Sequence, residues 1–176
     1  MTAPRTAPSA LAVSSDPEKA AVLDELVAAD RELTVRAERA ARSRLADVDT
    51  DDVANAVVAA LLRLDQEDLA AHAGRTRNGY VEPTEAAWSL LEKAVEPWLE
   101  DITRRASLGL TEAARRLGLG ILEALRRIDR HLRNDDLLVS WAPDFPGETA
   151  NRVIELLSDL GFTLTDAELA HTSART

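Results

Sequence analysis

Histidine and carboxylate side chains are the residues of this chain that could bind a metal ion, because the sequence contains no cysteine. The three histidines, His72, His131 and His171, lie far apart in the sequence. Glu168 and His171 form one Glu-x-x-His pair, whereas a helical di-iron site needs two such pairs and two further glutamates. Asp68 and His72 share one face of a predicted helix, a spacing that many surface pairs also have. We therefore predict no metal site and no bound cofactor.

The acidic run at residues 47–52 is similar to the start of a calcium-binding loop. An EF-hand loop has glycine at its sixth position and glutamate at its twelfth, and these positions hold Asp52 and Val58 here. Acidic residues are also favourable at the N-terminus of a helix, where the helix dipole is positive. We interpret the run as a helix start in which Asp49 or Thr50 is the N-cap.

Motifs for nucleophilic catalysis and phosphate binding are missing or incomplete in the sequence. No Gly-x-Ser-x-Gly elbow is present, and Glu123 replaces the third glycine of the phosphate-loop pattern that residues 118–120 begin. Glu92, Glu96 and Glu100 repeat every four residues along one side of a predicted helix. We call these three residues the acidic strip and interpret them as a solvated face or an acidic docking strip. We predict no catalytic residues.

Arginine is concentrated in residues 115–133 of one predicted helix, where the only acidic residues are Glu123 and Asp129. The chain as a whole has 31 acidic and 21 basic residues and a net charge of −10, which disfavours binding to nucleic acid. We predict that this arginine strip pairs with the acidic strip or with the acidic surface of a neighbouring molecule. The arginine strip consists of Arg115, Arg116, Arg126, Arg127, Arg130 and Arg133.

Residues 110–128 resemble part of the helix-turn-helix family, with Ala114 followed four residues later by Gly118 at the position of the turn. The resemblance implies a DNA-binding regulator in which the C-terminal arginines of the strip contact phosphates. The family has polar residues where this chain has Ile121 and Leu122. We favour a continuous core helix with an arginine-rich outer face and retain the regulator as the alternative.

A second resemblance extends over more of the chain. The segments GYVEPTEAAW at 79–88 and WAPDFPGE at 141–148, with the AVEPWLE segment between them, resemble an uncharacterised group of bacterial all-helical proteins. The resemblance implies no activity and no catalytic residues. It does imply that residues 80–141 form one unit.

Apolar residues recur at helical spacing through most of the chain. The two best-patterned segments carry apolar stripes at steps of three and four residues, and we expect these stripes to pack against each other. The stripes are Trp88, Leu91, Val95, Trp98, Ile102 and Ala106 in one segment and Ala114, Leu117, Ile121, Leu125, Ile128 and Leu132 in the other. Pro97 predicts a kink or a break, and Gly118 and Gly120 favour a close helix crossing. The predicted helices cover residues 16–46, 51–64, 65–74, 84–107, 111–133 and 148–160, with a loop at 75–83 and a rigid turn at 142–147. The apolar stripe over 16–46 is thin and rich in alanine. Asn78-Gly79 favours a turn in the loop, and Gly161 fits a left-handed cap after the last helix.

These patterns predict an all-α fold of five to six helices packed as antiparallel hairpins in one bundle-like domain. The expected domain covers residues 16–170, between a disordered tail at 1–15 and a frayed C-terminus at 171–176. No segment has the roughly 20 apolar residues of a membrane-spanning helix, so we expect a cytoplasmic protein that does not bind membranes.

We predict a non-enzymatic interaction, scaffold or adaptor module with a protein partner or a homodimer, and we consider nucleic acid disfavoured. An enzyme with carboxylate chemistry of hydrolase type, or one using His72 in a cleft, is a further alternative. The expected interaction surface consists of the arginine strip together with Arg75, Arg77 and Tyr80 of the 75–83 loop.

Overall fold

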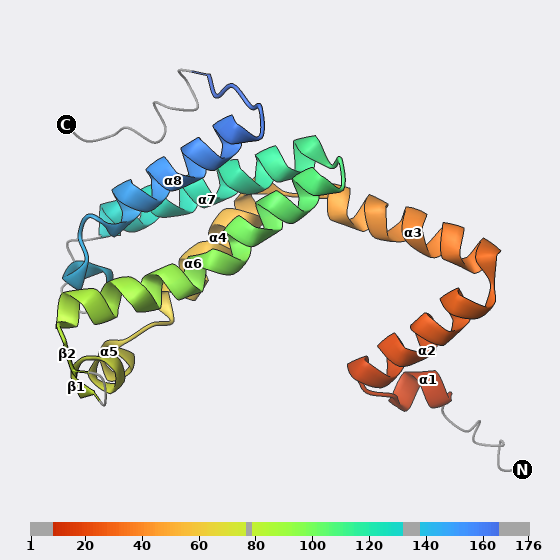
Figure 1. Ribbon diagram of the computed structural model, residues 1–176, viewed down its shortest axis with the longest axis horizontal. Helices are drawn as coiled ribbons and strands as arrows, with labels where there is room; N and C mark the ends of the chain where they lie inside the picture. The colour runs from red at the N-terminus through yellow and green to blue at the C-terminus, as the bar shows by residue number, and fades with distance from the viewer. Residues whose placement is uncertain (1–8, 77–78, 132–137, 166–176) are drawn as a thin grey trace, which may run out of the picture. The chain divides into compact units, whose positions relative to one another are not determined.

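The computed structural model describes residues 9–76, 79–131 and 138–165. Its internal contacts divide the chain into two compact units, residues 1–44 and residues 45–176. The predicted all-α class is confirmed. The predicted number of helices is wrong, because the described residues form eight α-helices, one 3-10 helix and a small two-stranded sheet rather than five or six helices (Figure 1).

The two additional helices both lie in the N-terminal unit. A short helix, α1 (Ala10–Val13), forms inside the segment predicted as a disordered tail, of which residues 1–8 lie outside the described residues. The single helix predicted over 16–46 is two helices, α2 (Asp16–Ala29) and α3 (Arg31–Ala46).

Asp30 is the physical reason for the break between α2 and α3. Its backbone is extended, with φ −137° and ψ 114°. Its carboxylate accepts hydrogen bonds from the backbone N–H groups of Glu32 at 2.7 Å and Leu33 at 3.3 Å. Asp30 therefore caps the N-terminus of α3.

The larger unit begins with two capped helices, α4 (Thr50–Leu62) and α5 (Gln66–His72). The Asp49 carboxylate accepts hydrogen bonds from the backbone N–H groups of Asp51 at 2.9 Å and Asp52 at 3.0 Å. This geometry confirms the interpretation of the acidic run as a helix start. Asp65 caps α5 in the same way.

The predicted 75–83 loop contains a small antiparallel hairpin of β1 (Gly74–Thr76) and β2 (Gly79–Val81). Arg75 lies opposite Tyr80 in the register. Gly79 has a φ of +136°, a conformation that side-chain-bearing residues rarely adopt. The expected turn at Asn78-Gly79 is not described in full, because residues 77 and 78 lie outside the described residues.

Helix α7 (Thr111–His131) lies at the centre of the core. It packs against α4, α6 (Pro83–Ser107) and α8 (Phe145–Asp159). In Figure 1, α6, α7 and α8 lie side by side. The predicted stripe of α7 is confirmed, with Leu117, Ile121, Leu125 and Ile128 at most 1% exposed. On α6, the predicted stripe is buried at Leu91, Val95 and Ile102 and partly buried at Trp88 and Trp98.

Pro97 lies within α6, and Gly118 and Gly120 lie within α7. Helix α6 is continuous through Pro97, so the predicted break does not occur. A Cβ atom added at Gly120 would lie 2.6 Å from Val53 Cγ1, and one added at Gly118 would lie 2.8 Å from Leu157 Cδ1. The predicted close crossings are therefore confirmed, with α4 at Gly120 and with α8 at Gly118.

A 3-10 helix (Leu138–Trp141) leads into α8, which begins at Phe145, three residues earlier than predicted. The Pro146 ring fits the first turn of a helix, where no backbone N–H is needed, so part of the predicted rigid turn is helical. At the other end of α8, Gly161 has a φ of +85° and forms the predicted left-handed cap.

Candidate interaction surfaces

The centre of the arginine strip lies over α4 rather than over the acidic strip. Arg126 and Arg127 both donate to the Glu123 carboxylate, with Nε–Oε distances of 2.7 Å for each. Arg127 also donates to the carboxylate of Asp51 and to the side-chain carbonyl of Asn55, both at 2.8 Å. Of the two predicted pairings of the arginine strip, the one with the acidic strip is therefore wrong for Arg126 and Arg127, which pair within α7 and with α4.

Glu123 is the electrostatic centre of this cluster. Partial burial raises the pKa of its carboxyl, but hydrogen bonds from Arg126 and Arg127 and the charges of these two arginines outweigh burial and lower it below the ordinary value of 4.5. The hydrogen bond to Glu123 in turn raises the pKa of Arg127. The cluster thus favours the charged form of Glu123 in the folded protein.

Replacing Glu123 by glutamine tests this cluster through the dependence of stability on pH. Because the folded-state pKa of Glu123 is lowered, its contribution to stability is present above about pH 4.5 and is lost as the pH falls through the lowered pKa. We expect urea unfolding at about pH 7 to show the wild type more stable by up to about 1 kcal/mol, the size of a partly exposed ion pair. The difference should be smaller at about pH 3 than at about pH 7. An equal difference at both pH values would contradict the assignment.

The remaining members of the predicted surface are dispersed. Arg116 pairs with Glu112 one helical turn away at 3.0 Å, and Arg130 Nε contacts the Arg126 carbonyl at 3.4 Å. Arg115 is half-buried. Arg77 and Arg133 lie outside the described residues.

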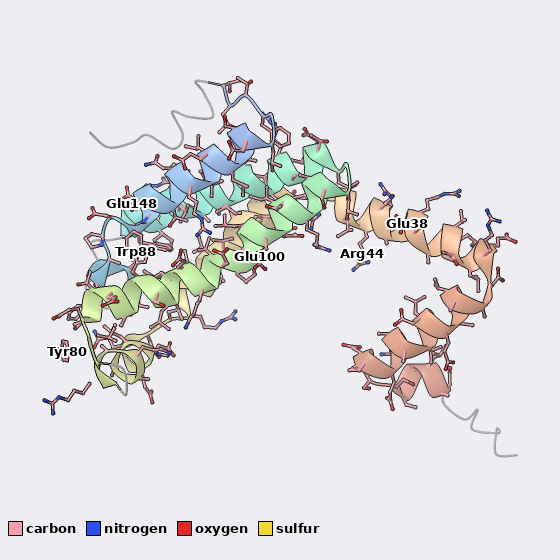
Figure 2. All side chains as sticks on the ribbon, in the orientation of Figure 1. Glu38, Arg44, Tyr80, Trp88, Glu100 and Glu148 are labelled. Atoms are coloured by element: carbon pink, nitrogen blue, oxygen red, sulfur yellow. The ribbon has the colours of Figure 1, made fainter. Side chains whose placement is uncertain are left out.

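Arg75 and Tyr80 lie together on the β1–β2 hairpin, as cross-strand neighbours that are both exposed. Tyr80 is 63% exposed and projects away from α6 (Figure 2). Exposed tyrosines next to arginines are frequent in protein–protein contacts. The structure therefore brings these two predicted residues together, apart from the cluster around Glu123.

The acidic strip pairs with α8. Arg152 donates to Glu92 at 3.1 Å and lies 3.0 Å from a carboxylate oxygen of Glu96. A shallow cleft of about 250 Å³ lies beside this pair, with Trp88 and Glu148 in its lining (Figure 2). Arg152 thus uses the charge of the strip to join α6 and α8, so an acidic docking strip would have to compete with this pairing.

No metal-binding cluster is found in the described part of the chain. Within residues 9–76, 79–131 and 138–165, no three His, Asp or Glu side chains converge on a point that could hold a metal ion. The ring of His72 is exposed, and its Nδ1 atom lies 2.8 Å from the Asp68 carbonyl. No helix in the same described ranges is long and apolar enough to cross a membrane.

The helix-turn-helix resemblance does not extend to the backbone. Helix α7 continues without interruption through Gly118 and Gly120, where the family has its turn. Ile121 and Leu122, which replace polar residues of the family, are at most 3% exposed. The favoured interpretation of residues 111–133 as a continuous core helix is confirmed as far as His131, and residues 132 and 133 lie outside the described residues.

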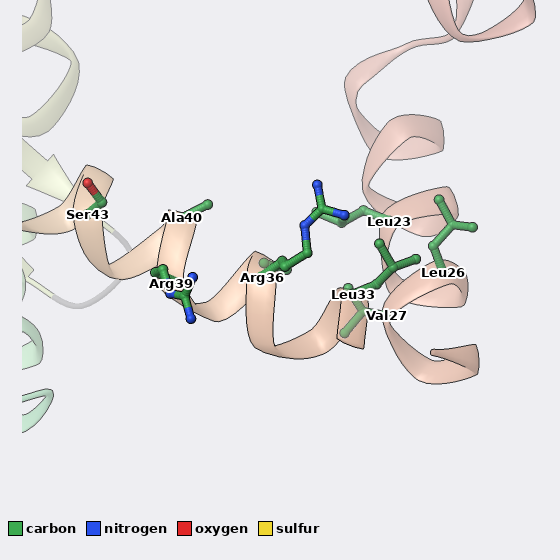
Figure 3. A pocket seen from close by; sticks show the side chains of 9 residues that line it. Leu23, Leu26, Val27, Leu33, Arg36, Arg39, Ala40 and Ser43 are labelled. Carbon is green, nitrogen blue, oxygen red and sulfur yellow. The ribbon is translucent and has the colours of Figure 1, made fainter. Parts of the chain in front are cut away.

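An apolar groove in the N-terminal unit was missed by the sequence analysis. This groove, of about 610 Å³, lies between α2 and α3 (Figure 3). We call it the N-terminal groove. It is lined by Leu23, Leu26 and Val27 of α2 and by Leu33, Arg36, Ala37, Arg39, Ala40 and Ser43 of α3.

The helices around the N-terminal groove leave most of their large apolar side chains exposed. No residue of α1, α2 or α3 is buried. Nine large apolar side chains are exposed among the described residues, and six of them belong to this unit. These six are Leu11, Val13, Val22, Leu23, Leu26 and Val35. The alanine-rich, thin apolar stripe over residues 16–46 was the sequence signal for this surface.

Comparisons with protein-family models, with curated proteins and with solved structures gave no match to this chain.

Proposed function

We propose that this chain is a non-enzymatic protein-interaction module that binds its partner through the N-terminal groove. One observation carries the proposal: α2 and α3 are helical, yet they bury none of their residues. Isolated helices of about 15 residues are marginal in water and depend on packing of an apolar face. Helices of this kind gain stability when a partner covers that face.

The core of the larger unit is complete without these helices. Every buried apolar residue of the described chain lies between Val48 and Leu157. The exposed leucines and valines of α2 and α3 therefore contribute nothing to that core. Exposed apolar surface that is gathered in one region is typical of protein–protein interaction sites.

The hairpin residues Arg75 and Tyr80 are a secondary contact surface in this proposal. The arginine strip is less suited to that role than the sequence suggested, since Arg126 and Arg127 already pair within the chain. A partner would have to replace the contacts of Arg127 with Asp51 and Asn55. A cytoplasmic location remains part of the proposal.

The two alternatives have weaker support. A regulator using residues 110–130 would need a turn within α7 and free arginines, and α7 is continuous. An enzyme would need polar groups that converge in a cleft. The polar groups at the cleft beside Trp88 include Glu92 and Arg152, which pair with each other.

A double substitution in the N-terminal groove tests the proposed function. We expect Leu23→Glu with Leu26→Glu in the full chain to abolish binding of any partner, because two charges would have to be desolvated in the contact. The measurement is affinity capture from native lysate with quantitative mass spectrometry. The matched control is Leu62→Glu, an exposed leucine of the larger unit.

The partner, whether a different protein or further copies of the chain itself, should be captured by the wild type and by the control but not by the double variant. Equal capture by all three proteins would contradict the proposal. A thermal unfolding curve that is the same for wild type and double variant would show that the larger unit is intact.

A further inference from the structure

We propose that the partner in the N-terminal groove is a second copy of this chain, with α2 of each molecule lying in the groove of the other. This inference rests on the proposed function and specifies the occupant of the same site. The resulting assembly is a symmetric bundle of two α2 and two α3 helices, in which each molecule supplies the same surface twice.

Charge complementarity carries the inference. Helix α2 has four acidic residues and one lysine, whereas α3 has five arginines and two glutamates. The two helices therefore have net charges of −3 and +3. In the proposed dimer, α2 of each molecule lies beside α3 of the other. The two-fold symmetry therefore gives two equivalent contacts between the molecules, and opposite charges meet at both.

The charges at the groove are available for such a contact. Arg36 and Arg39 line the groove and are exposed, and neither forms an ion pair with another described residue. The ion pairs within α2 and α3 join Lys19 with Asp16 and Arg42 with Glu38. On α2, Asp24 and Glu25 are exposed in the same way, without an ion pair among the described residues.

The distribution of apolar residues on α2 fits the same arrangement. Its large apolar side chains, Val22, Leu23, Leu26 and Val27, share one side of the helix, and alanines lie on the other sides. Val22, Leu23 and Leu26 are 37%, 55% and 50% exposed, although Leu23 and Leu26 both line the N-terminal groove together with residues of α3. A helix that is apolar on more than one side is buried when it lies between two neighbours. In the dimer these neighbours are its own α3 and the α3 of the second molecule.

Two charge-reversal variants of the full chain test the inference by sedimentation equilibrium. The first is Asp24→Lys with Glu25→Lys, which makes both helices basic. The second is Arg36→Glu with Arg39→Glu, which makes both helices acidic. We expect a dimeric wild type, and each variant alone should dimerise more weakly by about tenfold or more because like charges meet at both contacts.

An equimolar mixture of the two variants should restore a dimer with an affinity close to that of the wild type, because each contact between the two molecules of the mixed dimer is between opposite charges. A double variant that merely unfolded α2 or α3 would not be rescued in this way. Recovery in the mixture therefore separates a docking role of these charges from a structural one.

A wild type that remains monomeric at every concentration, or a mixture that stays as weak as its components, would overturn the inference. If the wild type is monomeric but Leu23→Glu with Leu26→Glu still abolishes capture of another protein, the groove binds a different partner. The second-copy inference then fails while the proposed function stands. If the wild type is monomeric and capture is also unaffected, both fail.

Discussion

Replacing Phe145 by alanine should lower the free energy of unfolding by about 3–5 kcal/mol, the range for loss of a large buried aromatic side chain. Phe145 is 1% exposed at the first position of α8. Its ring packs edge-to-face on Trp88 of α6, with the ring centroids 5.3 Å apart. The substitution opens a cavity where α8 begins and removes the aromatic contact with α6. The measurement is urea unfolding followed by circular dichroism.

Tyr80→Ala is the control for this variant. Tyr80 is also aromatic but is 63% exposed on the hairpin, so its loss should change the free energy of unfolding by no more than about 0.5 kcal/mol. Equal effects of the two substitutions would show that Phe145 does not have the buried position described above.

Gly120→Ala should destabilise the protein by about 1–3 kcal/mol, although alanine is the better helix former by about 1 kcal/mol. The added Cβ atom would lie 2.6 Å from Val53 Cγ1 and 2.8 Å from the backbone carbonyl oxygen of Thr50. The Val53 side chain can adjust only slightly, because it is itself 9% exposed in the core. The Thr50 oxygen belongs to the backbone, so α4 would have to move away from α7.

Gly147→Ala is the matched control, because this glycine also lies within a helix, α8, and a Cβ atom there would meet no atom within 4 Å. The better helix propensity of alanine then acts alone, and we expect the free energy of unfolding to rise by about 0.5–1 kcal/mol. The same urea-unfolding measurement should therefore give opposite signs at the two glycines. A higher free energy of unfolding for Gly120→Ala would mean that α4 and α7 do not cross closely at Gly120.

Local patterns were sufficient to predict the helices of the larger unit. The apolar steps of three and four residues on α6 and α7 placed Leu91, Ile102, Ile121 and Ile128 in the core, because the helical repeat alone determines which residues share a face. The caps at Asp49 and Gly161 followed from the chemistry of helix ends.

The break at Asp30 was missed because the apolar positions remain in helical phase on both sides of it. Aspartate in the middle of a helical pattern is ordinarily a surface residue. Whether it caps a new helix depends on whether the backbone there is extended, and the pattern of apolar residues does not determine that. The 3-10 helix and the early start of α8 are similar cases, in which short segments follow the packing of the long helices.

The sequence could not determine which charges meet. The arginine strip and the acidic strip have the right signs to pair, but the crossing of α4 over α7 places Asp51 beside Arg127, and the position of α8 places Arg152 beside Glu92. Both results depend on tertiary geometry. Likewise, the sequence indicated that the 16–46 stripe was thin but not that its apolar residues would be left uncovered.

Hydrogen exchange of backbone amides in the full chain tests most directly whether a partner covers α2 and α3. At a concentration where the wild type is associated, the account predicts slow exchange in both helices, and exchange near the rate of an unstructured chain in Leu23→Glu with Leu26→Glu. Amides of α4 to α8 should exchange alike in the two proteins. If the amides of α2 and α3 exchange at the same rate in the wild type and in the double variant, whether fast or slow, no partner covers these helices in the way proposed.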